Sequence, residues 1–124
     1  MLVIDENDTR FYAAPSKITG AGTGLFARQA LRAGDRLAVV GVRVRRDSEA
    51  DRCTAFADEY KIRAGSYLII PCGMAALANH SAEPNLEKVI EAESVFLQLL
   101  RDVEAGEELC LSYSDYARAR YGLP

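Results

Sequence analysis

LANHSAEPN, residues 77–85, contains the only histidine of the chain, His80. Asn79 and Ser81 flank this histidine, and Asn85 follows a proline at the end of the stretch. A histidine beside two polar side chains is more often a hydrogen-bonded structural residue than a catalyst, since each ring nitrogen readily finds a local partner. The meaning of the stretch therefore depends on the segments that accompany it.

Composition indicates one globular domain over residues 1–124. The chain has 49% hydrophobic and 27% charged residues, and a chain of this length buries about two-thirds of its unfolded surface. No run approaches the roughly 20 apolar residues of a membrane span, and residues 1–10 lack the pattern of a signal peptide. We expect a cytoplasmic protein without a membrane partner. Twelve arginines against three lysines are typical of a GC-rich bacterial genome.

Charge and cysteine usage narrow the function classes further. The net charge of −3 predicts no direct nucleic-acid partner, because such proteins usually carry a basic face. Residues 83–108 hold eight Asp/Glu against two Lys/Arg, an acidic segment that would attract a basic peptide. Cys53, Cys72 and Cys110 form no CxxC pair, so we expect three buried thiols and no metal site.

Short strands joined by turns dominate the pattern of the chain. β-Branched and aromatic runs alternate with glycine, proline and charged turns. Residues 36–44, RLAVVGVRV, form the strongest strand prediction. The predicted strands span residues 10–18, 24–29, 36–44, 66–70 and 109–113.

One amphipathic helix is predicted over about residues 48–60. Ser48 followed three residues later by Asp51 resembles a capping box. Apolar residues then recur at i, i+3, i+4 and i+7, the spacing of one helix face. These residues are Cys53, Phe56, Ala57 and Tyr60.

Residues 87–101, EKVIEAESVFLQLLR, are compatible with two structures. Their composition suits a helix, whereas VI and SVFLQLL could be two arms of a hairpin that turns around residues 91–93. The regularly spaced neighbouring strands favour the hairpin. A closing helical turn is expected over residues 115–121, ended by Gly122.

Three short motifs gain meaning from their order. SKITGAGTGLFA precedes NHSAEPN by about 50 residues, and GEELCLSY follows about 20 residues later. This order resembles the SET domain, the fold of protein lysine methyltransferases, over residues 16–113. The resemblance implies a mainly β, β-clip-like fold of short strands and small sheets, with one or two short helices and a knot-like crossing near the C-terminus.

The resemblance also implies S-adenosylmethionine as the cofactor. Asn79 and His80 match the segment that lies against the cofactor, where the backbone reads the adenine and the asparagine amide holds the amino-acid end. Gly22, Thr23 and Gly24 match the GxG motif of the family, where the missing Cβ lets the chain approach the methionine portion closely. Backbone groups of this kind bind a carboxylate and an ammonium without a metal.

Tyr113 ends the GEEL strand and matches the active-site tyrosine of the family. Methyl transfer needs a neutral lysine amine aligned with the methyl group. With an ordinary pKa of about 10.4, the neutral amine costs roughly 4.6 kcal/mol at pH 7. An apolar channel and the adjacent sulfonium both disfavour the ammonium. The Tyr113 hydroxyl would then orient the lone pair of the amine.

Further residues are candidates for the walls of the lysine channel. Tyr60 and Tyr67 are aromatic but match no firm motif. Tyr116 and Tyr121 lie beyond the last strand, where many family members carry a cysteine-rich zinc segment that this sequence lacks, and we hypothesise that the tail lays one of these rings over the channel. Leu111 stands where the family often has Tyr or Phe. Because leucine has no hydroxyl, we expect more than one methyl group to fit.

The leading hypothesis is an S-adenosylmethionine-dependent enzyme that methylates lysine in a protein or peptide substrate, within a basic sequence. The alternative is a catalytically weak or inactive SET-fold module that binds S-adenosylmethionine or a basic peptide. A Rossmann-type methyltransferase is disfavoured, because the glycine motif runs into a strand and does not open a helix in a βαβ unit. A homodimer stays possible.

Overall fold

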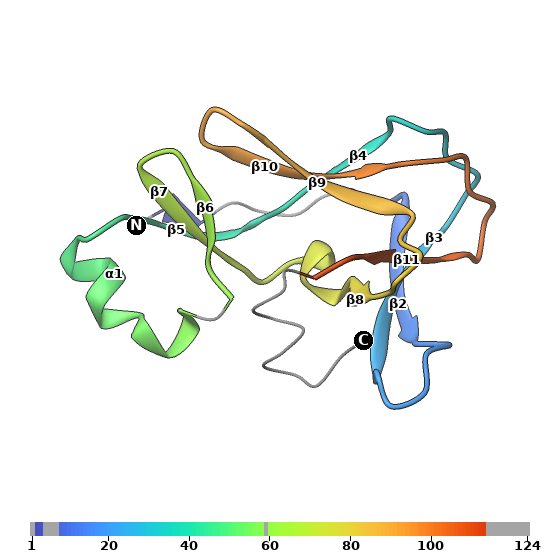
Figure 1. Ribbon diagram of the computed structural model, residues 1–124, viewed down its shortest axis with the longest axis horizontal. Helices are drawn as coiled ribbons and strands as arrows, with labels where there is room; N and C mark the ends of the chain where they lie inside the picture. The colour runs from blue at the N-terminus through green and yellow to red at the C-terminus, as the bar shows by residue number, and fades with distance from the viewer. Residues whose placement is uncertain (1, 4–7, 59, 114–124) are drawn as a thin grey trace.

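The computed structural model describes residues 2–3, 8–58 and 60–113 (Figure 1). The described residues fold mainly into short strands arranged in small sheets, as the sequence predicts. No helix in the described part of the chain is long and apolar enough to cross a membrane. The predicted helical turn at residues 115–121 lies outside the described residues.

The described strands form three sheets with the orders β1-β5-β7-β6, β4-β10-β9 and β2-β3-β11-β8. Only the contact between β11 and β8 is parallel among the pairs that build them. The strands are β1 (Leu2–Val3), β2 (Phe11–Pro15), β3 (Thr23–Ala27), β4 (Arg36–Ala38), β5 (Gly41–Arg45), β6 (Ile62–Ala64), β7 (Tyr67–Pro71), β8 (Asn79–His80), β9 (Leu86–Glu91), β10 (Ser94–Leu99) and β11 (Glu108–Leu111). The helices are α1 (Glu49–Cys53) and the 3-10 helices η1 (Ala55–Ala57) and η2 (Met74–Leu77).

The predicted single strand at residues 36–44 is wrong, because two strands occupy this stretch. β4 pairs with β10, whereas β5 pairs with β1 and β7 in another sheet. Val39 and Val40 are consecutive and both buried, so the alternation of one strand is broken between them. Gly41 begins β5 with its Cα against the backbone carbonyl of Ile70, where a Cβ would overlap the oxygen. The chain changes sheets at this point.

The hairpin predicted within residues 87–101 is confirmed, and the alternative helix is wrong. β9 and β10 pair antiparallel from Ser94 opposite Glu91 to Leu99 opposite Leu86. Ala92, in the turn, has a φ of +53°. Alternate residues of β10 are buried, as expected for a strand with one face on the core.

The predicted helix at residues 48–60 is confirmed at its start and is wrong in length. The Ser48 hydroxyl accepts a hydrogen bond from the Asp51 amide at 3.2 Å, as an N-cap does. α1 ends after five residues, and η1 follows it. The expected apolar face does not reach the core, because Phe56 is 82% exposed and Tyr60 is 55% exposed.

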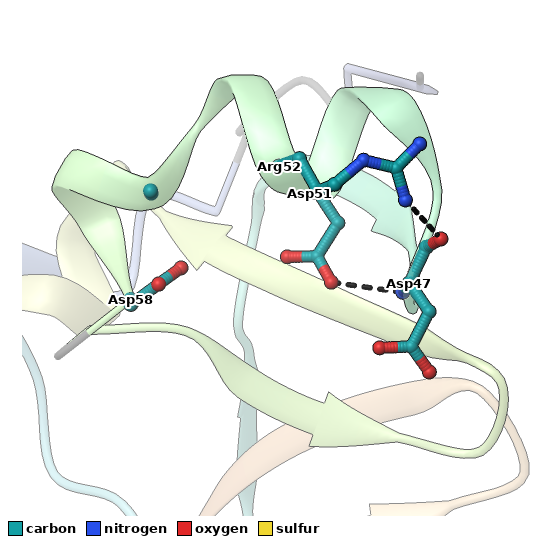
Figure 2. Close-up of a pocket in the computed structure, with 5 residues that line it drawn as sticks. Asp47, Asp51, Arg52 and Asp58 are labelled. Atoms are coloured by element: carbon teal, nitrogen blue, oxygen red, sulfur yellow. Dashed lines mark hydrogen bonds between the residues drawn. The ribbon is translucent and has the colours of Figure 1, made fainter.

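Charged groups attach α1 to the rest of the molecule in place of an apolar face. The Lys61 side chain is 3% exposed, and its ammonium lies 2.7 Å from an Asp51 oxygen and 2.6 Å from an Asp58 oxygen. Figure 2 shows the small pocket beside this ion-pair cluster, where the Arg52 guanidinium donates to the Asp47 carbonyl. No group of three or more potential ligand residues could hold a metal ion within the described residues.

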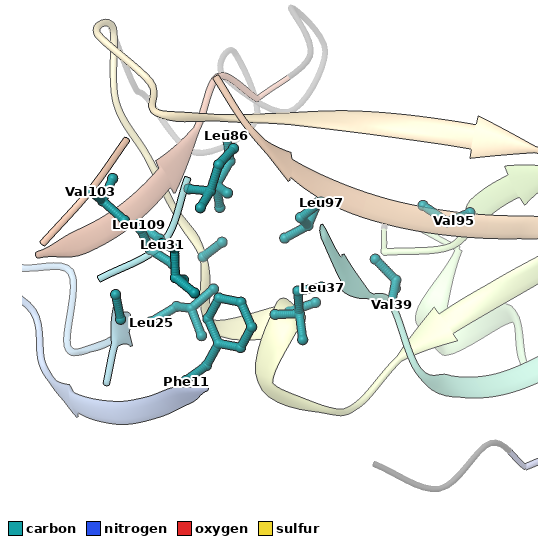
Figure 3. Packing of buried hydrophobic residues seen from close by; sticks show 14 of the residues in the cluster. Phe11, Leu25, Leu31, Leu37, Val39, Leu86, Val95, Leu97, Val103 and Leu109 are labelled. Carbon is teal, nitrogen blue, oxygen red and sulfur yellow. The ribbon is translucent and has the colours of Figure 1, made fainter. Parts of the chain in front are cut away.

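The hydrophobic core contains side chains from all three sheets, including Ile69 of β7. The side chains of Phe11, Leu37 and Leu97 gather at a common centre (Figure 3). Leu25 and Leu109, from β3 and β11, are fully buried beside them. Since β11 also leads to Tyr113, the core supports the last residues of the motif GEELCLSY.

The expectation of three buried thiols is wrong for Cys53 and Cys72, which are exposed. Cys110 is buried. Burial and then the negative charge of Glu108 raise the pKa of the Cys110 thiol to about 11. This thiol therefore stays protonated at neutral pH and serves packing.

We predict that Leu109→Ala lowers the free energy of unfolding by about 2–5 kcal/mol, because it opens a cavity in a fully buried place. Leu100→Ala is the matched control, since Leu100 is 46% exposed, and it should cost less than about 0.5 kcal/mol. Urea denaturation of both variants measures the difference. Equal costs for the two substitutions would contradict this assignment of the core.

Candidate functional site

A groove of about 960 Å³ brings the three motifs together. The loop at residues 18–21, the end of β7, η2, β8 and the start of β9 contribute to its walls. Asn79, His80 and Tyr113 line the same groove. Its volume falls in the range of pockets that bind cofactors and other small molecules.

The parallel pairing of β8 with β11 places Asn79 and His80 beside the last motif. Asn79 lies opposite Cys110, and His80 lies opposite Leu111. The Ser81 amide donates to the Leu111 carbonyl at 3.0 Å and continues this pairing. Two strands whose paired residues are 31 positions apart in the sequence thus form one wall of the groove.

Asn85 stabilises this pairing, although no role was predicted for it from the sequence. Its side-chain amide donates to the Glu108 carbonyl at 2.9 Å and accepts from the Cys110 amide at 2.8 Å. Its backbone amide donates to the Cys110 carbonyl at 3.1 Å. Asn85 is buried, so both ends of the amide need partners. The residue acts like an added strand segment along β11.

The imidazole of His80 is buried and has a structural contact with the candidate catalytic residue. Its Nδ1 accepts a hydrogen bond from the Tyr113 backbone amide at 3.0 Å. The two rings lie 5.4 Å apart between centroids. The side chain of the lone histidine therefore fixes the backbone of Tyr113.

The Tyr113 hydroxyl donates to the Ala78 carbonyl at 2.9 Å. Burial raises the pKa of this phenol above its ordinary value, and repulsion from Cys110 adds to the effect. The group therefore stays neutral at physiological pH. Because its hydrogen points to Ala78, the lone pairs of its oxygen are left to accept a hydrogen bond in the groove.

Glu108 joins the three motifs, and sequence reasoning missed it. Its carboxylate accepts hydrogen bonds from the Ser16 hydroxyl at 2.7 Å, the Lys17 amide at 2.9 Å and the Asn79 amide at 3.2 Å. Burial alone would raise the pKa of the Glu108 carboxyl, but these bonds and the charge of Lys17 together hold it below its ordinary value. The sequence feature that could have indicated this role is the second glutamate of the GEEL motif.

The GxG motif lies against this carboxylate. Gly22 has a φ of +73°, in the left-handed region that favours glycine, and its carbonyl accepts from the Ser16 amide at 2.7 Å. A Cβ on Gly24 would lie 2.6 Å from Glu108 Oε2 and 3.3 Å from Asn79 Nδ2. The space that a side chain would need at Gly24 is thus already taken by protein.

The structure separates the channel candidates. Tyr60 and Leu111 line the groove together with Tyr113. Tyr116 and Tyr121 lie outside the described residues, and so does the tail that we expected to cover the channel.

Tyr67 is not among the described residues that line the groove. Its ring lies under the Arg43 guanidinium, 4.5 Å from the ring centroid, and 6.0 Å from that of Arg45. Such stacking is favourable on the surface of a sheet. Tyr67 therefore does not form a wall of this groove, because β7 places its ring beside the arginines of β5.

The acidic segment at residues 83–108 is not one open acidic face. Glu91 pairs with Arg36 at 2.8 Å. Glu107 pairs with Arg101 at 3.1 Å, and the Glu108 carboxylate is used within the site. The charge that this segment offers to a basic peptide is smaller than its composition predicts.

We predict that Glu108 contributes stability at neutral pH that is lost in acid. A carboxyl with a lowered folded-state pKa stabilises the fold above its ordinary value of 4.5, and the contribution disappears as the pH falls through the folded-state value. The difference in unfolding free energy between wild type and Glu108→Gln should therefore be constant near pH 7 and shrink below pH 4.5. Glu104→Gln, on an exposed position, is the control. A difference in unfolding free energy that does not change with pH would contradict a stabilising role of the Glu108 charge.

Comparison with known proteins agrees with this geometry. The family model of the SET domain matches residues 22–114. A solved structure of a humanized mutant of the Chaetomium thermophilum Polycomb Repressive Complex 2, bound to an inhibitor, contains a chain of similar fold, with a TM-score of 0.68 and 20% identity. The match covers 85% of the present chain and 15% of that chain. No curated protein matches the sequence.

The likeness to the solved structure supports the fold alone, whereas the family match covers most of the chain and includes GTGLFA, NHSAEPN and GEELCLSY. Residues 18–21, Asn79, His80 and the end of the last motif at residues 111–113 line one groove. The GxG motif and Glu108 contact this groove wall through their hydrogen bonds to Asn79. The chain belongs to the SET domain family, whose members are generally protein lysine methyltransferases.

Proposed function

We propose that the protein transfers a methyl group from S-adenosylmethionine to the side-chain amine of lysine in a protein substrate. One observation carries the proposal: Tyr113 and Asn79 line one groove, and the Asn79 side chain donates a hydrogen bond to the Thr23 carbonyl of the GxG motif at 3.2 Å. The groove therefore has a candidate cofactor-binding residue, Asn79, and a candidate catalytic residue, Tyr113, in its walls.

The residues present fit this cofactor. Open space adjoins Gly22, where a Cβ would meet no atom within 4 Å, so the backbone there is accessible to a ligand. Residues 22–24, Asn79 and the backbone of His80 would hold the cofactor. When bound, S-adenosylmethionine supplies an electrophilic methyl group on a sulfonium.

Tyr113 would act on the incoming lysine. Its hydroxyl is a hydrogen-bond acceptor toward the groove because its own hydrogen is directed to Ala78. By accepting a hydrogen bond from an N–H of the neutral amine, the hydroxyl would fix the direction of the single lone pair on the nitrogen. Leu111 and Val39 supply apolar surface in the same groove, which disfavours the charged form of the amine by desolvation.

We predict that Tyr113→Phe lowers kcat/KM by at least about 30-fold, near 2 kcal/mol, as removal of a positioned polar group does in other active sites. Tyr67→Phe is the matched control, since that ring lies away from the groove, and it should keep nearly full activity. Transfer of a labelled methyl group into a cell lysate, followed by identification of the modified residue, measures both.

Several results of this labelling experiment, or of a separate calorimetric measurement, would contradict the proposal. Labelling of a residue other than lysine would exclude the reaction, and equal activity of the two phenylalanine variants would exclude the role of Tyr113. Calorimetric binding of S-adenosylmethionine without any transfer would favour the alternative, a SET-fold module without turnover.

We also predict that the wild-type product carries more than one methyl group on the same lysine. Leu111 lines the groove and has no hydroxyl to restrain a partly methylated amine. Leu111→Tyr should shift the product toward the monomethyl form, because the larger polar ring occupies space and adds a hydrogen-bonding group. Mass spectrometry of the modified peptide reads both outcomes. A wild-type product limited to one methyl group would refute the role of Leu111.

A further inference from the structure

We infer that Glu108 is a positioning residue that orients the Asn79 amide so that the site selects a ligand with a free ammonium group. The inference rests on the proposed function for the identity of the ligand, S-adenosylmethionine or its product. Its basis is the hydrogen-bond pattern around one side-chain amide.

Both hydrogens of the Asn79 amide have partners within the protein. Nδ2 donates to the Thr23 carbonyl at 3.2 Å and to Glu108 Oε2 at 3.2 Å. Both partners can only accept, so the nitrogen must face them and the amide cannot flip. No described residue donates to the remaining oxygen, Oδ1. Asn79 therefore presents an acceptor to the groove that it lines.

The charge of Glu108 keeps this orientation. Oε2 also accepts from the Ser16 hydroxyl at 2.7 Å, and Oε1 accepts from the Lys17 amide at 2.9 Å. The bonds favour the ionised carboxylate, which has no hydrogen to donate to Asn79. A protonated glutamate or a glutamine at this position could donate a hydrogen bond to Asn79 Oδ1, and the Asn79 amide would then rotate by half a turn.

The neighbouring groups leave little freedom for another arrangement. A Cβ on Gly24 would touch the Glu108 carboxylate and the Asn79 amide nitrogen. Both side chains therefore pack directly against the backbone of Gly24. Within the described part of the chain, the charged and titratable groups that act on Glu108 are Lys17 and Cys110. The Lys17 ammonium donates to the Gly106 carbonyl at 3.2 Å, and the Cys110 thiol is neutral.

An amide oxygen next to a carboxylate favours a cationic group with hydrogens to donate. A primary ammonium satisfies both requirements, because it offers three donors and a positive charge. The amino-acid end of S-adenosylmethionine carries such an ammonium. Glu108 would thus help the site to distinguish amine-bearing nucleosides from deaminated ones, acting through Asn79.

Calorimetry with two ligands tests this role without turnover. The ligands are S-adenosylhomocysteine, which keeps the ammonium, and its deaminated analogue. Wild type should bind S-adenosylhomocysteine about tenfold or more tightly than the analogue, the expected gain from a charge-assisted hydrogen bond. In Glu108→Gln this ratio should fall to about threefold or less, while the affinity for the analogue changes little.

Two further variants separate positioning from a general structural effect. Asn79→Ala should reduce the ratio in the same way, and combining it with Glu108→Gln should add no further loss, since both substitutions act at one contact. Glu107→Gln should keep the wild-type ratio, because the Glu107 carboxylate bonds to Arg101 and the Glu104 amide.

The inference is overturned if Glu108→Gln keeps the wild-type ratio or weakens both ligands equally. If that variant does not fold, an unchanged ratio in Asn79→Ala overturns it as well. Failure of wild type to bind either ligand would overturn the proposed function and this inference with it. Binding of both ligands by wild type with equal affinity would overturn the inference alone.

Discussion

The parallel pairing of β8 with β11 is the contact on which the candidate site depends. Two residues on each strand make this pairing, and it brings Asn79 and His80 beside the strand that leads to Tyr113. So short a contact is weak by itself, since strands of two residues gain few hydrogen bonds. Asn85 compensates for this by bonding its side chain and backbone to β11. Without this pairing the groove would lose the wall that the NHS segment and Tyr113 share.

A second constraint is the Glu108 carboxylate, which connects β11 to the loop before β3. A partly buried carboxylate is costly unless hydrogen bonds stabilise it, and Ser16, Lys17 and Asn79 supply these bonds. Gly24 leaves the space in which they meet. The same polar network therefore stabilises the fold and sets the chemistry of the groove. Polar networks of this kind are rigid when every member has a partner.

Much of this arrangement could be predicted from the order of the motifs. Asn79, His80 and Tyr113, which line the groove, could be selected before their positions were known, because a family resemblance encodes long-range contacts that local patterns do not. The cofactor role of Gly22, Thr23 and Gly24 stays a prediction. Local patterns were sufficient for the β9–β10 hairpin, where alternation of buried residues marks the strands. They failed at residues 36–44, where a continuous apolar run hides the change of sheets at Gly41. They also did not indicate that the Tyr67 ring stacks on Arg43, because Arg43 lies on a neighbouring strand.

The roles of Glu108 and Asn85 could not be predicted, because each depends on partners from at least one distant segment. A glutamate in a turn motif and an asparagine after a proline are ordinary in a sequence, and only the folded chain gives them several bonds each. A crystal structure with S-adenosylhomocysteine tests the central claim most directly. The account predicts the ligand between residues 22–24 and 79–80, with its sulfur toward the Tyr113 hydroxyl. A ligand bound elsewhere, or a phenol turned away from the sulfur, would contradict it.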